Sequence, residues 1–194
     1  MSAGAAPALV GIVIPTWNGK TMLRECLTAL RAQTFRDFAV YVADNGSTDG
    51  TREMLATEFP EARLVALPNN RGFTGAVNAG LRAGTEPLVA LLNNDVLAEP
   101  TWLAELVGRA QAHPEESIWA CVTVWVHRPE LIESAGVALF RDGTPAILRR
   151  TEPLSALPQA PVRVPGASGG AALFRRAVFE RIGLFDERFF CYGE

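Results

Sequence analysis

The chain alternates short, continuously apolar runs with longer segments whose apolar residues recur every three to four positions. Continuous runs predict strands that are covered on both faces, and the longer period predicts helices with one buried face. The predicted strands cover residues 9–14, 38–43, 63–67 and 89–92. The predicted helices follow them at about residues 22–30, 54–59, 74–83 and 101–112.

The order of these elements predicts an α/β fold. Strands that alternate with helices at this pitch form right-handed crossovers, which give a mostly parallel sheet with helices on both faces. Pro15 should close the first strand, because proline cannot donate to a sheet and is tolerated at strand ends. The apolar side chains of the first helix should face the sheet; they are Met22, Leu23, Cys26, Leu27 and Leu30.

The second half of the chain has a less regular pattern. Residues 118–126 are typical of one strand, on which Trp119 and Trp125 would share a face and belong to the core. Further predicted segments are a strand at residues 133–140, an irregular loop rich in Pro and Ala at 151–165, a strand at 171–174 and a helix ending at Ile182.

Small residues at positions 166–170 precede the last predicted strand. Gly169 and Gly170 would let a ligand approach the backbone closely, since glycine has no side chain in the way. They would equally suit a tight strand entry packed against a neighbouring element. The pattern leaves both interpretations open.

Polar clusters follow three of the predicted strands, at residues 16–19, 44–50 and 93–95. Open α/β sheets bind ligands beyond the carboxyl ends of their strands, so these clusters should meet in one binding site. Asp95, which follows Asn93 and Asn94, is well placed to hold a divalent cation against a diphosphate. The alternative for this cluster is a plain turn, because Asn and Asp are common turn residues.

The cluster at 44–50 combines a strand end with a helix start. Thr48 or Asp49 would cap the following helix by accepting a hydrogen bond from its first-turn amides. Capping does not explain Asp44, which lies at the end of the strand before the turn begins. This position predicts an exposed carboxylate that binds a nucleobase or a ribose. A turn without a ligand is again the alternative.

Composition and charge narrow the function. The 194 residues suit one domain, and a net charge of −3 with no basic stripe disfavours nucleic acid as a partner. Cys26, Cys121 and Cys191 lack metal-ligand spacing and are expected to be small buried residues in a reducing compartment. No signal peptide and no apolar run of about 20 residues occurs, so we expect a soluble, cytoplasmic protein, with peripheral membrane contact left open.

Neither histidine has the spacing of metal ligands in the sequence. His113 lies near a predicted helix end, where a cation is favourable, and His127 is expected to be structural or solvated. Trp17 either stacks at the border of a nucleotide pocket or packs against the core, with packing slightly favoured.

Five segments together resemble the family 2 glycosyltransferases, and within them the bacterial rhamnosyltransferase-like branch. The resemblance runs in the family's order from about residue 10 to the last residue. The segments are VIPTWN at 13–18, DNGSTDGT at 44–51, NNRGF at 69–73, LLNND at 91–95 and GLFDERFF at 183–190.

The resemblance implies a GT-A fold, a Rossmann-like three-layer sandwich, that binds a nucleotide-sugar donor. Asp44 would read the base, and Asp95 would be the principal contact of Mg²⁺ or Mn²⁺, since Asn93 replaces the first carboxylate of the family's Asp-X-Asp motif. Pro15, Thr16, Asn18 and Ser47 would line the nucleoside pocket, Asn70, Arg71, Gly72 and Asn78 would shape the floor, and Asn93 and Asn94 would complete the donor site.

The resemblance also implies an acceptor side. The family's catalytic base belongs to a Glu-Asp pair that removes a proton from the acceptor hydroxyl with inversion at the anomeric carbon. Glu194 supplies the Glu, and the sequence ends before the Asp, so we expect a truncated active-site motif. Gly169, Gly170 and Asp186 would face the acceptor. The chain would form one GT-A domain, with a nucleotide-binding half at about 9–95 and an acceptor half at about 96–194.

The leading hypothesis is therefore an inverting, metal-dependent glycosyltransferase in surface polysaccharide or glycolipid assembly. It would take a dTDP- or UDP-linked sugar and a saccharide or lipid-linked saccharide acceptor. The alternative is a catalytically incomplete nucleotide-sugar binding domain. A nucleotidyltransferase or an NAD-linked dehydrogenase is disfavoured, because residues 16–19 lack a glycine-rich phosphate loop.

Overall fold

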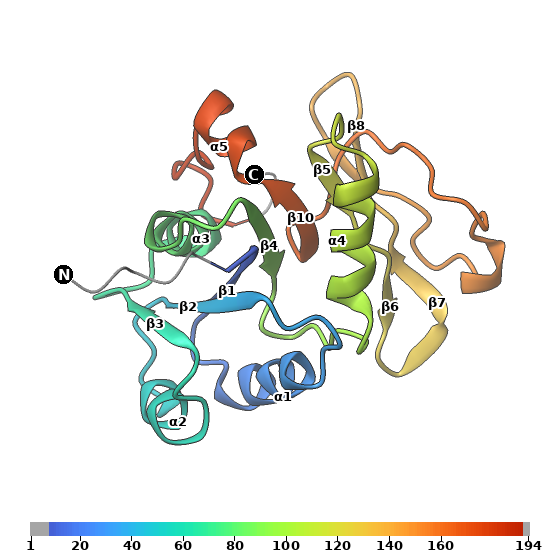
Figure 1. Cartoon of the computed structure of the whole chain (residues 1–194). Coiled ribbons are helices and arrows are strands. Elements are labelled where there is room, and N and C mark those ends of the chain that lie inside the picture. The colour runs from blue at the N-terminus through green and yellow to red at the C-terminus, as the bar shows by residue number, and fades with distance from the viewer. Residues whose placement is uncertain (1–7, 192–194) are drawn as a thin grey trace.

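The computed structural model describes residues 8–191, which form a mixed six-stranded sheet flanked by helices (Figure 1). The strand order is β3-β2-β1-β4-β10-β5. Only β10 runs against its neighbours, so the predicted mostly parallel sheet is confirmed. The strands are β1 (Val10–Thr16), β2 (Phe38–Asp44), β3 (Arg63–Ala66), β4 (Leu88–Leu92), β5 (Ile118–Ala120) and β10 (Ala171–Arg175).

Helices cover both faces of the sheet, which makes three layers (Figure 1). One face packs against α1 (Lys20–Arg31), α2 (Thr51–Glu58) and α4 (Trp102–Ala112). The other packs against α3 (Gly72–Ala83) and α5 (Arg176–Ile182). Alternate strand residues supply the two cores: Ile12 and Ile14 belong to the first, and Val13 between them belongs to the second.

Two small two-stranded sheets extend beyond β5 and α4 (Figure 1). They comprise β6 (Thr123–Trp125) with β7 (Arg128–Ser134) and β8 (Val137–Leu139) with β9 (Pro145–Ile147). The segment at 151–165 is irregular as predicted, apart from one 3-10 turn, η1 (Leu154–Ala156).

The predicted strand at 118–126 is wrong, because the chain leaves the central sheet after Ala120 and enters a different sheet at Thr123. Trp119 is therefore a core residue, whereas Trp125 lies half-buried beneath the Arg150 guanidinium. The predicted strand at 133–140 is also divided. Gly136 interrupts it with a φ of +109°, a left-handed conformation that a glycine adopts readily.

Pro15 lies inside β1 and does not close it, since the strand continues to Thr16. Pairing with β4 ends at Val13, while pairing with β2 continues to Thr16. Successive N–H groups of a strand point to alternate sides, and the Val10 N–H donates toward β2. The backbone N of residue 15 therefore points toward β4. No ladder partner lies there at this level of the strand, so the missing N–H of proline removes no bond.

Two predicted burials are corrected. Met22 is 46% exposed, because it lies one position from Leu23 and falls outside the buried stripe of α1. Cys191 is exposed, whereas Cys26 and Cys121 are buried as expected. In the described part of the chain, no helix is both long enough and apolar enough to cross a membrane.

Candidate functional site

Three loops meet at the carboxyl ends of β1, β2 and β4, as the sequence predicted. The Asn18 N–H donates to Ser47 Oγ at 2.8 Å, and Asn18 Oδ1 accepts from the Thr48 N–H at 2.8 Å. Asn94 Nδ2 donates to Thr16 Oγ1 at 2.9 Å, which links the β4 loop to the β1 loop. These bonds join the first loop to both others, so the cluster is one connected structure.

Asp49 connects the starts of two helices at this edge. Its carboxylate accepts from the Lys20 N–H of α1 at 2.9 Å and from the Thr51 N–H of α2 at 3.1 Å. The N-cap residue of α2 is Gly50, so the predicted capping role belongs to Asp49 just before it and not to Thr48. Desolvation raises the pKa of Asp49, but hydrogen bonds from Thr51 and Lys20 outweigh it and lower the pKa overall.

Asp44 is not the exposed carboxylate that the sequence predicted. Its side chain is fully buried, because β1 and β3 flank the end of β2 on both sides. Oδ1 accepts from the Ser47 N–H at 3.2 Å, and Oδ2 accepts from Nε of Arg52, a residue of the first turn of α2. The sequence did not reveal this partner, since no local signal connects a strand-end carboxylate to an arginine eight residues later.

Asn45 holds the loop at 69–72 beside this cluster. Its Nδ2 donates to Asn70 Oδ1 at 2.8 Å and to the Gly72 carbonyl at 3.0 Å. Its Oδ1 accepts from the Arg71 N–H at 2.8 Å. Asn45 is 4% exposed and uses its whole amide in these contacts, so it positions the predicted floor residues. Sequence reasoning did not single it out.

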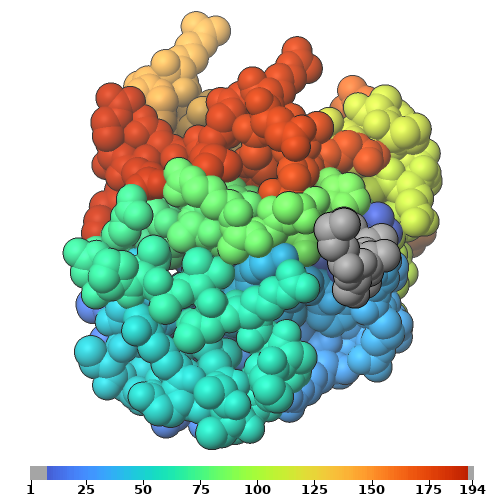
Figure 2. Space-filling view, turned by 60° about the vertical axis from the view of Figure 1, so that its left-hand side comes forward, coloured from blue at the N-terminus to red at the C-terminus, as the bar shows by residue number. Residues whose placement is uncertain are grey.

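The segment at 185–190 is bound along α3 and Arg71, and we call these contacts the clasp. Figure 2 shows this face, where the red C-terminal segment lies along the green region of α3. Phe73 donates its N–H to the Phe190 carbonyl at 2.7 Å, and Thr74 Oγ1 donates to the Phe189 carbonyl. Gly72 has a φ of +73°, and a Cβ there would overlap the Phe190 carbonyl.

Asn78 and Glu187 form the other end of the clasp. Asn78 is buried; it donates to the Phe185 carbonyl at 2.8 Å and to Glu187 Oε1 at 3.1 Å, and it accepts from the Phe185 N–H at 3.1 Å. Glu187 also pairs with Arg71 and Arg82. Asn78 can therefore shape the predicted floor only through the segment that it holds.

Asp186 belongs to the same segment, and its carboxylate forms an ion pair with the Arg188 guanidinium. Hydrogen bonds from Arg188 lower the pKa of Asp186 to about 2. Its predicted acceptor role stays a prediction. The predicted catalytic residue, Glu194, lies outside the described residues.

A groove of about 1700 Å³ opens between the β4 loop and the small sheets. Asn93 and Asp95 line it, together with Gly169 and Gly170. The Asn93 N–H donates to the Gly170 carbonyl at 2.8 Å, and a Cβ at Gly169 would lie 3.1 Å from Phe73 Cζ. Gly169 therefore packs closely against Phe73, and both glycines border the groove. Their predicted role in letting a ligand approach the backbone stays a prediction.

The donor atoms at this loop suit a divalent cation. Asn93 Oδ1 is buried and, among the residues that the structure describes, has no hydrogen-bond partner. The Asp95 side chain is exposed two residues later. Such oxygen ligands are those that Mg²⁺ and Mn²⁺ prefer, so the residues present fit the predicted metal.

The loop after Asp95 is held by the side chain of Gln33, which lies two residues beyond the end of α1. Gln33 is fully buried; its Nε2 donates to the Glu99 carbonyl at 2.7 Å, and its Oε1 accepts from the Leu103 N–H at 3.0 Å. It thus supplies a cap to α4 from a distant part of the sequence, which no local pattern could have revealed.

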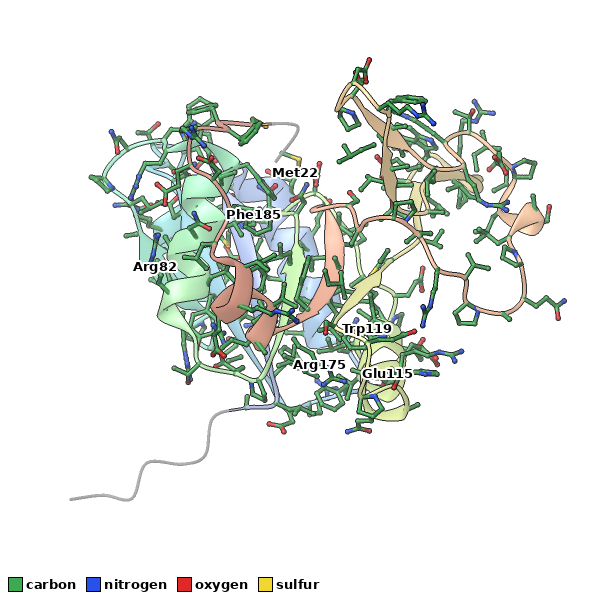
Figure 3. The ribbon with its side chains drawn as sticks, turned by 90° about the horizontal axis from the view of Figure 1, so that it is seen from above. Met22, Arg82, Glu115, Trp119, Arg175 and Phe185 are labelled. Atoms are coloured by element: carbon green, nitrogen blue, oxygen red, sulfur yellow. The ribbon has the colours of Figure 1, made fainter. Side chains whose placement is uncertain are left out.

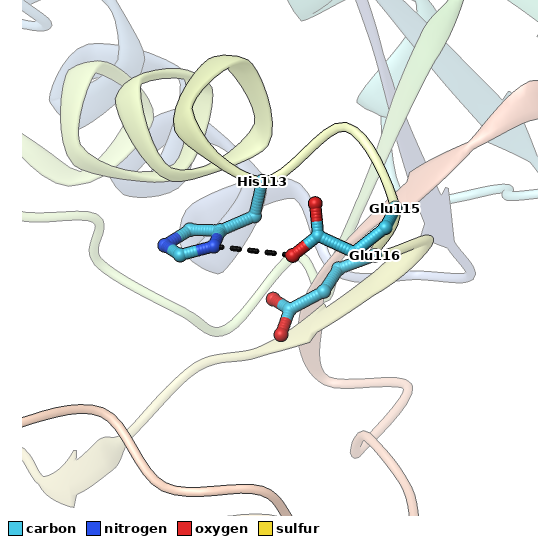
Figure 4. A group of neighbouring side chains, drawn as sticks. All are labelled: His113, Glu115 and Glu116. Carbon is cyan, nitrogen blue, oxygen red and sulfur yellow. Dashed lines mark hydrogen bonds and ion pairs between the residues drawn. The ribbon is translucent and has the colours of Figure 1, made fainter.

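A second group of metal-ligand types occurs at His113, Glu115 and Glu116 (Figure 4). His113 ends α4, as predicted, and its Nδ1 lies 3.4 Å from Glu115 Oε1. Figure 3 shows Glu115 far from Met22, which lies in the first turn of α1 beside the loop cluster. This group is therefore at the opposite edge of the sheet and takes no part in the candidate site.

Comparison with known proteins identifies relatives along most of the chain. Residues 11–183 match the family model described as Glycosyl transferase family 2. The chain is 32% identical to the O-antigen biosynthesis protein RfbC of Myxococcus xanthus, over 93% of this chain and 15% of that protein. It is 30% identical to the N-acetylglucosaminyl-diphospho-decaprenol L-rhamnosyltransferase of Mycobacterium tuberculosis, over 94% of this chain and 66% of that protein.

A solved structure shares the fold. The mannosyltransferase PcManGT from Pyrobaculum calidifontis, in complex with GDP-Man and Mn²⁺, superposes with a TM-score of 0.65 and 25% identity, over 94% of this chain and 48% of that chain. The predicted GT-A fold and the resemblance to the rhamnosyltransferase-like branch are thus confirmed. The chain spans 15% and 66% of the two curated relatives. The family model covers most of its length, and the chain belongs to glycosyl transferase family 2.

Proposed function

We propose that the chain forms the donor-binding domain of an inverting, metal-dependent glycosyltransferase. The enzyme would move a sugar from a nucleoside-diphosphate sugar to an acceptor hydroxyl. The convergence of the loops at 16–19, 44–50 and 93–95 carries this proposal, because hydrogen bonds join them at the edge where open α/β sheets bind ligands. Residues 9–95 would bind the nucleotide, and the later residues around the groove would face the acceptor.

Asn93 and Asp95 would hold the metal of the site. The buried, unpartnered Oδ1 of Asn93 supports this role, and the exposed carboxylate of Asp95 supplies the charge. When bound, Mg²⁺ or Mn²⁺ would supply positive charge that stabilises the departing diphosphate. The mannosyltransferase PcManGT was solved with Mn²⁺, which supports a divalent ion of this kind here.

The nucleoside would lie between the β1 and β2 loops, against Pro15, Thr16 and Asn18. The groove would receive the transferred sugar and the acceptor, with Gly169 and Gly170 on its wall. A carboxylate must take the proton of the attacking hydroxyl, and the resemblance assigns this role to the Glu-Asp pair of which Glu194 supplies the Glu. Attack from the side opposite the diphosphate would invert the anomeric carbon.

The relatives support a donor and an acceptor class. A rhamnosyltransferase and an O-antigen biosynthesis protein among them favour surface polysaccharide or glycolipid assembly. The dTDP- or UDP-linked sugar is proposed by analogy with the rhamnosyltransferase-like branch. The name of the rhamnosyltransferase includes a decaprenyl diphosphate, which favours a lipid-linked saccharide as acceptor. We propose that the reaction takes place at the cytoplasmic face of the cell membrane, where such a lipid would be reached.

Calorimetric titration with UDP, dTDP and GDP, each with and without Mn²⁺, tests this function. We expect Mn²⁺-dependent binding of one nucleotide by the parent chain, and Asp95→Asn should weaken it at least about tenfold, since it removes the charged ligand. Asp37→Asn is the matched control, because Asp37 is exposed and precedes β2 at the opposite edge. Equal binding by the parent and Asp95→Asn would disprove the metal assignment.

A transfer assay with the corresponding nucleotide sugar separates the remaining alternatives. Release of the nucleotide in the presence of a lipid-linked saccharide acceptor would support transfer by the chain itself. Tight, Mn²⁺-dependent binding without release would support a nucleotide-sugar binding domain. Failure of all three nucleotides to bind would overturn both.

A further inference from the structure

The loop that carries Asp95 has little regular structure of its own. It connects β4 to α4 over residues 93–101 and contains turns but neither a helix nor a strand. Within it, the Val96 N–H donates to the Asn93 carbonyl at 3.2 Å. The path of the loop, and with it the place of the exposed Asp95 carboxylate, therefore depends on contacts from other segments.

The stretch before Asp95 is fixed at the end of β4. The Asn93 N–H donates to the Gly170 carbonyl at 2.8 Å, and Asn94 Nδ2 donates to Thr16 Oγ1 at 2.9 Å. These contacts come from β1 and from the segment that enters β10. They hold the loop on one side of the carboxylate only.

Two residues that follow α1 fix the stretch after Asp95. Gln33 Nε2 donates to the Glu99 carbonyl at 2.7 Å, and the Thr34 N–H donates to the Pro100 carbonyl at 2.8 Å. In Figure 1 this part of the loop passes beside the end of α1. The carboxylate thus lies on a short span that is held at both ends.

The two ends of the Gln33 amide have different tasks. Its Oε1 accepts from the Leu103 N–H at 3.0 Å and caps α4, since the N-cap residue Thr101 makes no capping bond with its side chain. Capping needs an acceptor alone. The bond from Nε2 to the Glu99 carbonyl serves the loop and not the helix. A fully buried amide is costly unless it is hydrogen-bonded, and here both of its ends are paired.

We propose that Gln33 is a positioning residue for the metal site, which it serves by holding Asp95 in place through the loop. The inference rests on the proposed metal-dependent function. Only residues 96–98 separate Asp95 from Glu99, so a shift of the loop at Glu99 reaches the carboxylate. A functional side chain must be held to within about 0.5 Å of its productive position, which the exposed loop alone does not ensure.

Titration of Mn²⁺ in the presence of UDP, dTDP or GDP, followed by calorimetry, tests the proposal. It gives the Mn²⁺ concentration at which nucleotide binding is half-maximal. Gln33→Met keeps the length of the side chain but removes both hydrogen bonds, so this concentration should rise at least about tenfold, as is typical when a residue that orients a metal ligand is lost.

Val107→Ala is the control for stability alone. Val107 is buried in α4, so its truncation should lower the unfolding midpoint without a change at the loop. The Mn²⁺ concentration at half-maximal binding should then stay within about twofold of the parent's, because distant sites act independently. An increase as large as that of Gln33→Met would mean that general destabilisation explains both, and would overturn the proposal.

A second pair of variants decides the matter even if Gln33→Met does not fold. Leu97 is 48% exposed in the span after Asp95, whereas Val96 and Ala98 beside it pack against the core. Leu97→Gly frees the backbone between Asp95 and the contact with Gln33, and Leu97→Ala removes nearly the same side chain without that freedom. We expect Leu97→Gly to need at least about three times more Mn²⁺ than Leu97→Ala.

Equal Mn²⁺ requirements of the two Leu97 variants would overturn the inference, as would a folded Gln33→Met with the Mn²⁺ requirement of the parent. In both cases the proposed function would stand, because the parent would still bind nucleotide with the metal. If the parent bound none of the three nucleotides, or bound one equally well in EDTA, the proposed metal-dependent function would fail and the inference with it.

Discussion

Amide side chains join segments of the candidate site that lie far apart in the sequence. Asn45 and Asn78 are buried, and each uses both its amide N–H donor and its amide oxygen to bind a distant segment. Asn94 is half-buried and binds Thr16 through its N–H donor. An amide suits this task because it offers donors and acceptors without the desolvation cost of a charge.

Replacing Asn45 tests this role at the residue scale. Asn45→Ala leaves the Arg71 N–H and Asn70 Oδ1 without a partner from residue 45, so we expect the free energy of unfolding to fall by about 1–3 kcal/mol. Urea denaturation measures the change. Asn69→Ala is the matched control, because Asn69 is exposed in the same loop and should change stability by less than about 0.5 kcal/mol. Equal losses of unfolding free energy in the two variants would show that the Asn45 hydrogen bonds do not stabilise the fold.

Gly72 combines a left-handed backbone with a close contact. Gly72→Ala should lower the free energy of unfolding by more than about 1 kcal/mol, since a Cβ meets both the strained φ and the Phe190 carbonyl. Gly143→Ala separates the two effects, because Gly143 has a φ of +84° with nothing within 4 Å of a Cβ. Urea denaturation of both variants should show the larger loss of unfolding free energy for Gly72→Ala. Similar losses would mean that the clasp accommodates the added Cβ without loss of stability.

At the scale of elements, the loops of the site are held by helices on both sides of the sheet. Gln33, which follows α1, fixes the loop that follows Asp95, and α3 holds the clasp. The site is thus placed by packed elements and not by loop residues alone, which is how a preformed binding geometry is maintained.

The clasp should depend on pH through Glu187. A hydrogen bond from Asn78, with Arg71 and Arg82 nearby, lowers the pKa of Glu187 below its ordinary 4.5. Because the folded state has the lower pKa, the stabilisation is complete above the unfolded-state pKa and is lost as pH falls through the folded-state value. The stability difference between the parent and Glu187→Gln should therefore be present at neutral pH and shrink below pH 4.5.

Urea denaturation of both chains across this pH range measures the effect. Glu180→Gln serves as the control, since Glu180 is exposed on α5 and should differ little from the parent at any pH. A difference between the parent and Glu187→Gln that does not change with pH would show that the carboxylate charge has no part in the clasp.

At the scale of the whole molecule, the candidate site connects the strands that carry the core. The loops at 16–19, 44–50 and 93–95 leave adjacent strands of one sheet, whose order is β2-β1-β4. A ligand that binds all three loops binds the folded state only, so it should stabilise the entire domain by mass action.

Thermal unfolding with nucleotide and Mn²⁺ tests this coupling. At a ligand concentration of about 100 times Kd, the folded state should gain about 2.7 kcal/mol, which raises the unfolding midpoint in one transition. Excess EDTA should reverse the shift if the nucleotide needs the metal. A midpoint that does not move with a nucleotide shown to bind would mean that binding is not linked to folding of the sheet.

Local sequence patterns were enough to predict the order of strands and helices in the first half of the chain and the edge at which the polar loops meet. These features follow from local patterns: continuous apolar runs make buried strands, and parallel strands end at the same edge of a sheet. The second half was predicted less well, because the run at 118–126 has no turn residue to mark where the chain changes sheets.

Tertiary structure decided which polar groups are available to a ligand. The sequence shows Asp44 at a strand end but not that Arg52 and the strands beside β2 enclose it. It shows Asn93 beside Asp95 but not that Asn93 Oδ1 is left unpartnered, and it gives no sign of the roles of Asn45 and Gln33. Hydrogen bonds between segments far apart in the chain leave no periodic trace, so only the folded structure reveals them.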